Sequence, residues 1–174
     1  MANRDNPRGF WPHGHLCGGE IRTNPYIVTT GATVYKNDVL KAVAGGTVQT
    51  SAANDGAIVV GVAAEYVDDS ASAGGKAINV YDDPNIIFGV QADTGTAVAA
   101  TDVFSMANHV AGSGSTLTHL SGHEIDSSQL AAQGGNQLKV LGKIEAPDND
   151  WGEHVDLRVI FNEHLFRGAA VNGL

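Results

Sequence analysis

The chain has 174 residues, a mass of 18.0 kDa and a formal net charge of −9 at pH 7, and its length fits one domain with an additional arm or tail. The acidic balance argues against general nucleic-acid binding, which needs a basic surface. There is no apolar run of about 18 residues for a membrane-spanning helix, and the single cysteine, Cys17, excludes an internal disulfide framework and a multi-cysteine zinc site.

Residues 1–25 are predicted to form an extended N-terminal arm. Three of the five prolines lie in this segment, and each removes a backbone donor and favours extended geometry in the residue before it. The arm also contains large apolar side chains that a disordered tail would not usually carry: Phe10, Trp11, Leu16 and Ile21. We therefore expect the arm to pack, either on its own body or on a neighbouring subunit.

Residues 26–162 are predicted to form a β-rich body, and residues 163–174 a short C-terminal tail. In the body, β-branched and aromatic residues stand in short runs separated by turn signals, which indicates roughly eight to ten short strands. The clearest strand candidates are residues 26–30, 33–35, 39–43, 47–50, 57–66, 76–81, 86–92, 137–144 and 154–161.

Two of these segments carry stronger patterns than the others. Residues 57–66 are almost continuously apolar, which predicts a strand that is buried on both faces or closed into a barrel. Residues 154–161 alternate instead, and this places Val155, Leu157 and Val159 on one face of a half-buried strand.

The rest of the body is less regular. Residues 97–104 suit a short helix or a strand, residues 111–115 a flexible loop, and residues 127–133 one or two helical turns. Strands and helices do not alternate, and no repeat of fixed period is present. The sequence therefore predicts an all-β fold, a single β-barrel or jelly-roll-like domain with an extended N-terminal arm.

Two groups of histidines are candidate metal ligands. His13, His15 and Cys17 are spaced two apart, so on a strand their side chains would point to one side. The second group could form a metal site like that of cupin barrels, although the spacing typical of cupins is absent: His123, Glu124, His154, Glu163 and His164. We favour arm packing for the first group and surface or subunit contacts for the second, and we assign no metal, cofactor or catalytic residue.

Pairs of acidic residues suggest calcium binding as a further interpretation: Asp68-Asp69, Asp82-Asp83, and Asp148 with Asp150. The full spacing of a calcium loop, with its terminal bidentate glutamate, is missing, so turn chemistry explains these residues better. The nucleophile elbow, the phosphate-binding loop and the dinucleotide fingerprint are also missing. These observations predict a protein that is not an enzyme.

Several short phrases follow one another along nearly the whole chain. In the arm they are Gly9-Phe10-Trp11-Pro12, His15-Leu16-Cys17-Gly18-Gly19 and Asn24-Pro25-Tyr26. In the body they include Val34-Tyr35-Lys36-Asn37-Asp38-Val39, Val60-Gly61-Val62-Ala63, Tyr81-Asp82-Asp83-Pro84, Pro147-Asp148-Asn149-Asp150-Trp151-Gly152 and Val159-Ile160-Phe161-Asn162-Glu163-His164. In this order the phrases resemble the head decoration, or cement, proteins of tailed bacteriophages.

The resemblance implies a β-rich structural protein in the virion, on the outer surface of the capsid. Such a protein binds the major capsid protein and stabilises contacts between capsid subunits, often as a homotrimer. The arm would then lie over a capsid subunit or a neighbouring copy. The expected interface residues belong to the arm and the start of the body: Phe10, Trp11, His15, Leu16, Ile21 and Tyr26. The family carries no catalytic motif.

The main alternative is a receptor- or glycan-binding β-domain on a virion or cell surface. Such a domain needs exposed aromatic side chains, for which Trp11 and Trp151 are the candidates, but aromatic residues make up only 6% of the chain. A metal-dependent β-barrel enzyme is a second alternative. The major shell protein itself is a third, although it would need a longer chain with a long helix.

Overall fold

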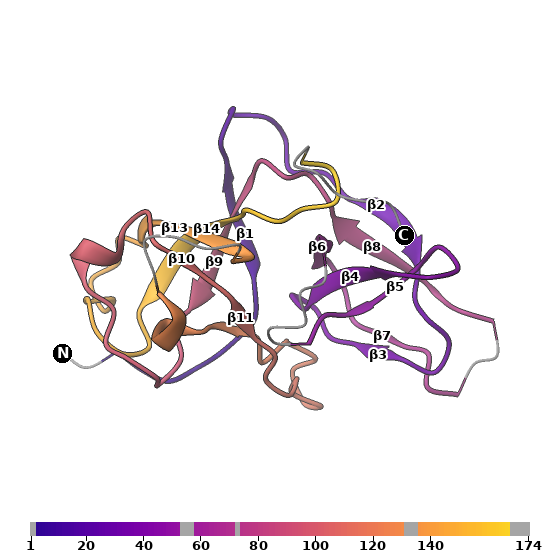
Figure 1. Cartoon of the computed structure of the whole chain (residues 1–174). Helices are drawn as coiled ribbons and strands as arrows, with labels where there is room; N and C mark the ends of the chain where they lie inside the picture. Colours follow the sequence, from indigo (N-terminus) through magenta and orange to yellow (C-terminus); the bar gives the residue numbers. More distant parts are fainter. Residues whose placement is uncertain (1–2, 53–57, 72–73, 131–135, 168–174) are drawn as a thin grey trace.

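The chain is almost entirely β-structure (Figure 1). The computed structural model describes residues 3–52, 58–71, 74–130 and 136–167. In these residues the only helical elements are two short 3-10 turns, Ala100–Asp102 and Ser127–Gln129, and no helix is long and apolar enough to cross a membrane. The predicted all-β class is confirmed.

The first of two five-stranded sheets has the order β1-β9-β14-β13-β10, with all neighbours antiparallel. Its strands are β1 (Trp11–His15), β9 (Ile86–Gln91), β14 (Asp156–Phe161), β13 (Leu138–Lys143) and β10 (Met106–Ala107). Alternate side chains of the central strands point into one hydrophobic cluster. The predicted inward face of the last strand is confirmed, because Val155, Leu157 and Val159 are all buried.

The second sheet has the order β2-β8-β6-β4-β5 and is also antiparallel. Its strands are β2 (Asn24–Ile27), β8 (Ala77–Tyr81), β6 (Val59–Ala63), β4 (Val39–Val43) and β5 (Thr47–Thr50). Two small pairs complete the fold: β3 (Thr33–Val34) with β7 (Val67–Asp68), and β11 (His109–Val110) with β12 (Glu124–Ile125).

Strand β6 joins the two halves of the core. All its residues are buried, as its apolar run predicts. Val59 and Val62 pack in the cluster shared with the first sheet, whereas Val60 and Ala63 pack in a second cluster. Gly61 allows β6 to lie against β8, since a Cβ at this position would be 2.2 Å from the carbonyl oxygen of Tyr81.

The N-terminal segment packs on its own chain, which is one of the two arrangements expected for it. Strand β1 pairs with β9 at the edge of the first sheet, and β2 forms an edge of the second. Both strands contain a proline, Pro12 and Pro25, and an edge strand tolerates the missing N–H donor. The strand at Trp11–His15 was not predicted, because Pro12 and Gly14 interrupt any local strand pattern.

In two other segments the structure shows shorter elements than the sequence predicts. Residues 93–123 contain a 3-10 turn and two very short strands, β10 and β11, in place of one longer element. Of the helical turns expected over residues 127–133, a 3-10 turn forms at Ser127–Gln129, where the Asp126 side chain caps the N–H of Ser128, and residues 131–133 lie outside the described residues.

Candidate interaction surface

The segment from Leu16 to Thr23 connects β1 to β2 and therefore links the two sheets. All its residues are exposed, and the segment extends beyond the sheets at the top of Figure 1. We call it the projecting loop. Its two large apolar side chains, Leu16 and Ile21, are 50% and 38% exposed. The loop thus holds hydrophobic groups in solvent, where another protein could cover them.

The side chain of His15 fixes the base of the projecting loop. Its Nδ1 accepts hydrogen bonds from the N–H groups of Cys17 and Gly19, each at 3.1 Å. The ring proton is therefore on Nε2, which donates to Oδ2 of Asp83 at 3.2 Å. Because both ring nitrogens are engaged, His15 has a structural role in the arm, as favoured over metal binding with His13 and Cys17.

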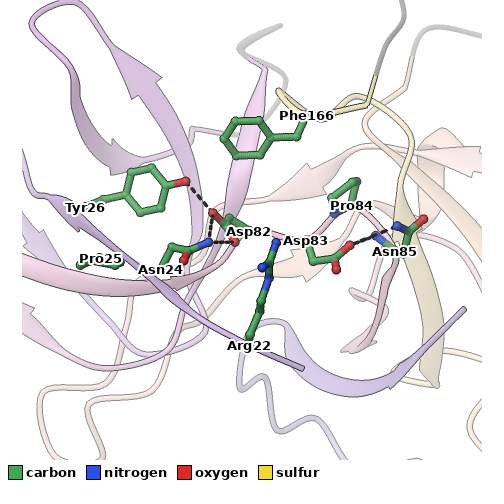
Figure 2. Close-up of a pocket in the computed structure, with 9 residues that line it drawn as sticks. All are labelled: Arg22, Asn24, Pro25, Tyr26, Asp82, Asp83, Pro84, Asn85 and Phe166. Carbon is green, nitrogen blue, oxygen red and sulfur yellow. Dashed lines mark hydrogen bonds between the residues drawn. The ribbon is translucent and has the colours of Figure 1, made fainter. Parts of the chain in front are cut away.

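Below the loop lies a hollow of about 660 Å³ (Figure 2). It is lined by Arg22, Asn24, Pro25, Tyr26, Asp82, Asp83, Pro84, Asn85 and Phe166. The turn at residues 82–85 forms its floor and connects β8 to β9, so the hollow lies between the two sheets. The lining contains no serine, cysteine, histidine or lysine, and its titratable side chains are Arg22, Tyr26, Asp82 and Asp83.

The buried carboxylate of Asp82 organises the wall of this hollow. It accepts two hydrogen bonds of 2.9 Å from Nδ2 of Asn24 and one of 2.6 Å from the hydroxyl of Tyr26. Burial, followed by the hydrogen bond to Asp82, raises the pKa of Tyr26 well above its usual value. Tyr26 therefore remains a neutral donor at physiological pH, and Asp82 connects the side chains of Asn24 and Tyr26 in the wall of the hollow.

The neighbouring Asp83 holds the turn at the floor. Its Oδ1 accepts a 2.8 Å hydrogen bond from the N–H of Asn85, a turn that Asp side chains commonly form. This bond, assisted by His15, lowers the pKa of Asp83. Asp68 forms an equivalent turn with the N–H of Ser70. The turn chemistry expected from the sequence thus holds for one member of each acidic pair, Asp83 and Asp68, whereas Asp82 bonds Asn24 and Tyr26, and Asp69 is buried.

The rim of the hollow carries one cation and one apolar ring. Figure 2 shows the Arg22 side chain reaching toward the 82–83 turn, with Phe166 on the opposite side. Phe166 is 53% exposed, so it offers a second exposed apolar group on this part of the surface, besides those of the projecting loop.

The structure divides the six predicted interface residues into two groups. Phe10 is not an interface residue, because its side chain is fully buried and stacks on Phe161 with ring centroids 5.7 Å apart. Trp11 lies against its own sheet, where a Cβ on Gly89 would be 2.3 Å from the indole, and the guanidinium carbon of Arg8 is 4.0 Å from its ring centroid. Both side chains thus pack against residues of their own chain.

Of the other four predicted residues, only Tyr26 lines the hollow. His15 contacts Asp83, Tyr26 contacts Asp82, and Leu16 and Ile21 lie on the projecting loop. The sequence did not predict the hollow itself or the contributions of Arg22 and Phe166, because no local pattern connects the end of β14 to the 82–85 turn.

The histidines of the C-terminal third require a correction. His123 and His164 are buried, so they are neither surface nor subunit-contact residues. Burial lowers the pKa of His123 to about 3 and that of His164 to about 4. Glu124 and His154, in contrast, approach each other, and they are joined by Asp5 from the N-terminal segment.

Comparison with protein-family models gave no match for this chain, and no curated protein matched it.

Proposed function

We propose that this chain is a capsid decoration (cement) protein of a tailed bacteriophage, which binds the outer surface of the head and stabilises contacts between major capsid subunits. The observation that carries the proposal is the projecting loop, which holds Leu16 and Ile21 in solvent. The resemblance of ordered phrases along the chain supports the same function. A barrel or jelly-roll-like relation of the two sheets is part of the proposal, supported by their shared core.

The fixed base of the loop explains how such binding would be efficient. His15 and the hydrogen bond from the N–H of Leu16 to the carbonyl of Asn85 hold the loop before it binds. A preformed loop loses less conformational entropy on docking than a free tail. A contact of about 1,600 Å² is enough for specific attachment, and repetition over many capsid sites would add avidity.

The alternative functions have weaker support. A glycan-binding surface needs an open aromatic face, but Arg8 covers one side of Trp11 and the strand backbone at Gly89 the other. Trp151 is 36% exposed, so most of its surface is also covered. A role as an enzyme has little support from the hollow, because its one hydroxyl, on Tyr26, already donates to Asp82 and has a raised pKa that keeps it protonated.

The location is tested by immunogold electron microscopy of heads from the phage that encodes this chain. We expect label on the outer surface of intact heads and a fixed ratio of this polypeptide to the major capsid protein. Absence of the polypeptide from purified heads would contradict the proposal. Light scattering of the pure protein should give about three times 18.0 kDa if it is a homotrimer.

The role of the loop is tested by a binding assay on heads prepared without this protein. The double substitution Leu16→Ser and Ile21→Ser should weaken binding at least tenfold, because it removes the exposed apolar contacts. Leu117→Ser is the matched control, since Leu117 is 92% exposed but lies in a different loop. Equal loss of binding in both variants, or loss in neither, would contradict a docking role for the projecting loop.

A further inference from the structure

Three potential metal ligands converge on one side of the first sheet, away from the hollow. They are the carboxylates of Asp5 and Glu124 and the imidazole of His154, and their ligand atoms all lie within 4.8 Å of one another. They come from the N-terminal segment, from β12 and from the turn before β14. Among the described residues, this is the one group of three or more such side chains that comes together.

A buried glutamine holds two of these ligands in place. The Oε1 atom of Gln91 accepts a 2.8 Å hydrogen bond from the N–H of Asn6, and its Nε2 donates to the carbonyl groups of Arg4 and His154, at 3.0 Å each. One side chain thus fixes the backbone on both sides of Asp5 together with the backbone of His154. The backbone of Asp5 and that of His154 are therefore held next to each other by the fold, although the Asp5 side chain itself is 63% exposed.

Glu124 is fixed by strand pairing near the same glutamine. It pairs with Val110 in the small β11-β12 sheet, and the next residue, Ile125, bridges to Ala92, which directly follows Gln91. All three ligands are thus positioned around the end of β9. Rigid positioning of this kind lowers the entropy lost when an ion binds.

The imidazole of His154 points to a missing partner. The side chain is only 14% exposed, and its Nδ1 atom is buried without a hydrogen-bond partner. The nearest carboxylate oxygen, Oδ1 of Asp5, is 3.9 Å away, which is too far for a hydrogen bond. A buried polar atom without a partner is costly, and binding an ion would satisfy it.

The negative charges around Glu124 also favour a bound cation. Its carboxylate is partly buried and lies near the carboxylates of Asp5 and Asp93. Within the described part of the chain, no lysine or arginine forms an ion pair with any of these three carboxylates. A divalent cation would supply the missing positive charge.

We propose that Asp5, Glu124 and His154 bind one divalent transition-metal ion, with Zn²⁺ as the best match to one imidazole nitrogen and two carboxylates. Zinc ligands lie about 2.0–2.2 Å from the ion, so a small movement of the side chains brings all three donor atoms onto it. Ca²⁺ fits less well, because it takes six to eight oxygen ligands. The bound ion would fasten the N-terminal segment to the body. This inference does not depend on the proposed function.

The test is isothermal titration of the full-length, chelator-treated protein with ZnCl₂ and, separately, with CaCl₂. We expect one Zn²⁺ per chain, a thermal midpoint that rises with Zn²⁺, and binding of Ca²⁺ at least tenfold weaker. Glu124→Gln and His154→Asn should each weaken Zn²⁺ binding at least tenfold. Asparagine is chosen because it tolerates the φ of 56° found at position 154.

Glu153→Gln is the matched control, because it makes the same change of charge as Glu124→Gln on an exposed neighbour outside the cluster. It should bind Zn²⁺ like the unchanged protein. Thermal unfolding of each metal-free variant verifies that it folds. If His154→Asn does not fold, the Zn²⁺ affinity of Glu124→Gln alone tests the proposal. Absence of Zn²⁺ binding, undiminished binding by Glu124→Gln, or Ca²⁺ binding as tight as that of Zn²⁺ would overturn the proposal.

Discussion

The inner and outer parts of the N-terminal segment carry similar residues but occupy opposite environments. In the inner part, Phe10 is fully buried and its N–H donates to the carbonyl of Asn37. In the outer part, Leu16 and Ile21 are exposed on the projecting loop. The change occurs at His15, where the pairing of β1 with β9 ends. Large apolar residues in this one segment thus belong to the core on the near side of His15 and to the surface beyond it.

The largest expected effect tests the inner part of this comparison. Phe10→Ala removes a ring that stacks on Phe161 and lies in the core shared by both sheets. We expect the free energy of unfolding, measured in urea, to fall by about 3–5 kcal/mol. Ile21→Ala, the control on the projecting loop, should change it by less than about 0.5 kcal/mol. Similar costs for both substitutions would remove the distinction between the two parts.

The second test measures how the burial of His164 makes the stability of the protein depend on pH. Burial lowers the pKa of His164 to about 4, whereas the unfolded chain should titrate near the ordinary value of 6.5. Between these values the unfolded state binds a proton that the folded state does not. The contribution of His164 to the free energy of unfolding is therefore fully present above pH 6.5. It decreases by about 3 kcal/mol as the pH falls toward 4.

Urea unfolding at several pH values measures this effect. His164→Asn cannot titrate in this range, so its stability should depend less steeply on pH than that of the unchanged chain. Identical slopes for the two proteins would show that the burial of His164 does not control the acid response.

The smallest effect concerns the boundary between the two parts. His15→Ala removes the acceptor for two N–H groups of the projecting loop and the donor to Asp83. We expect a loss of roughly 1–2 kcal/mol and faster hydrogen exchange confined to residues 16–23. His13→Ala is the matched control, since His13 is exposed at the irregularity in β1. Unchanged exchange in His15→Ala would show that the loop is held by other contacts.

The sequence predicted the strands whose patterns are local, and missed the features that depend on distant pairing. The apolar run that became β6 and the alternation that became β14 needed no partner to be recognised. Strand β1 contains a proline and forms only because β9 offers it an edge. The burial of Phe10 could not be read from composition either, because it depends on Phe161 at the other end of the chain.

The candidate sites follow the same rule. His15 and Tyr26 were predicted as interface residues, but their partners Asp83 and Asp82 were predicted only as turn residues, with calcium binding as the less favoured interpretation. Glu124 and His154 belonged to a group of five candidate ligands that the sequence analysis did not favour as a metal site, and of these five only Glu124 and His154 are in the cluster. Asp5 was missed, because nothing near it in the sequence indicates that Gln91 draws the N-terminal segment toward β14.

The position of β6 has a consequence for how the molecule comes apart. Its side chains contribute to both hydrophobic clusters, so neither sheet can open without exposing part of the core of the other. Such shared structure makes unfolding a single cooperative transition. A proteolytic fragment that kept only one sheet would retain an apolar strand with no cover, and it would be prone to aggregate.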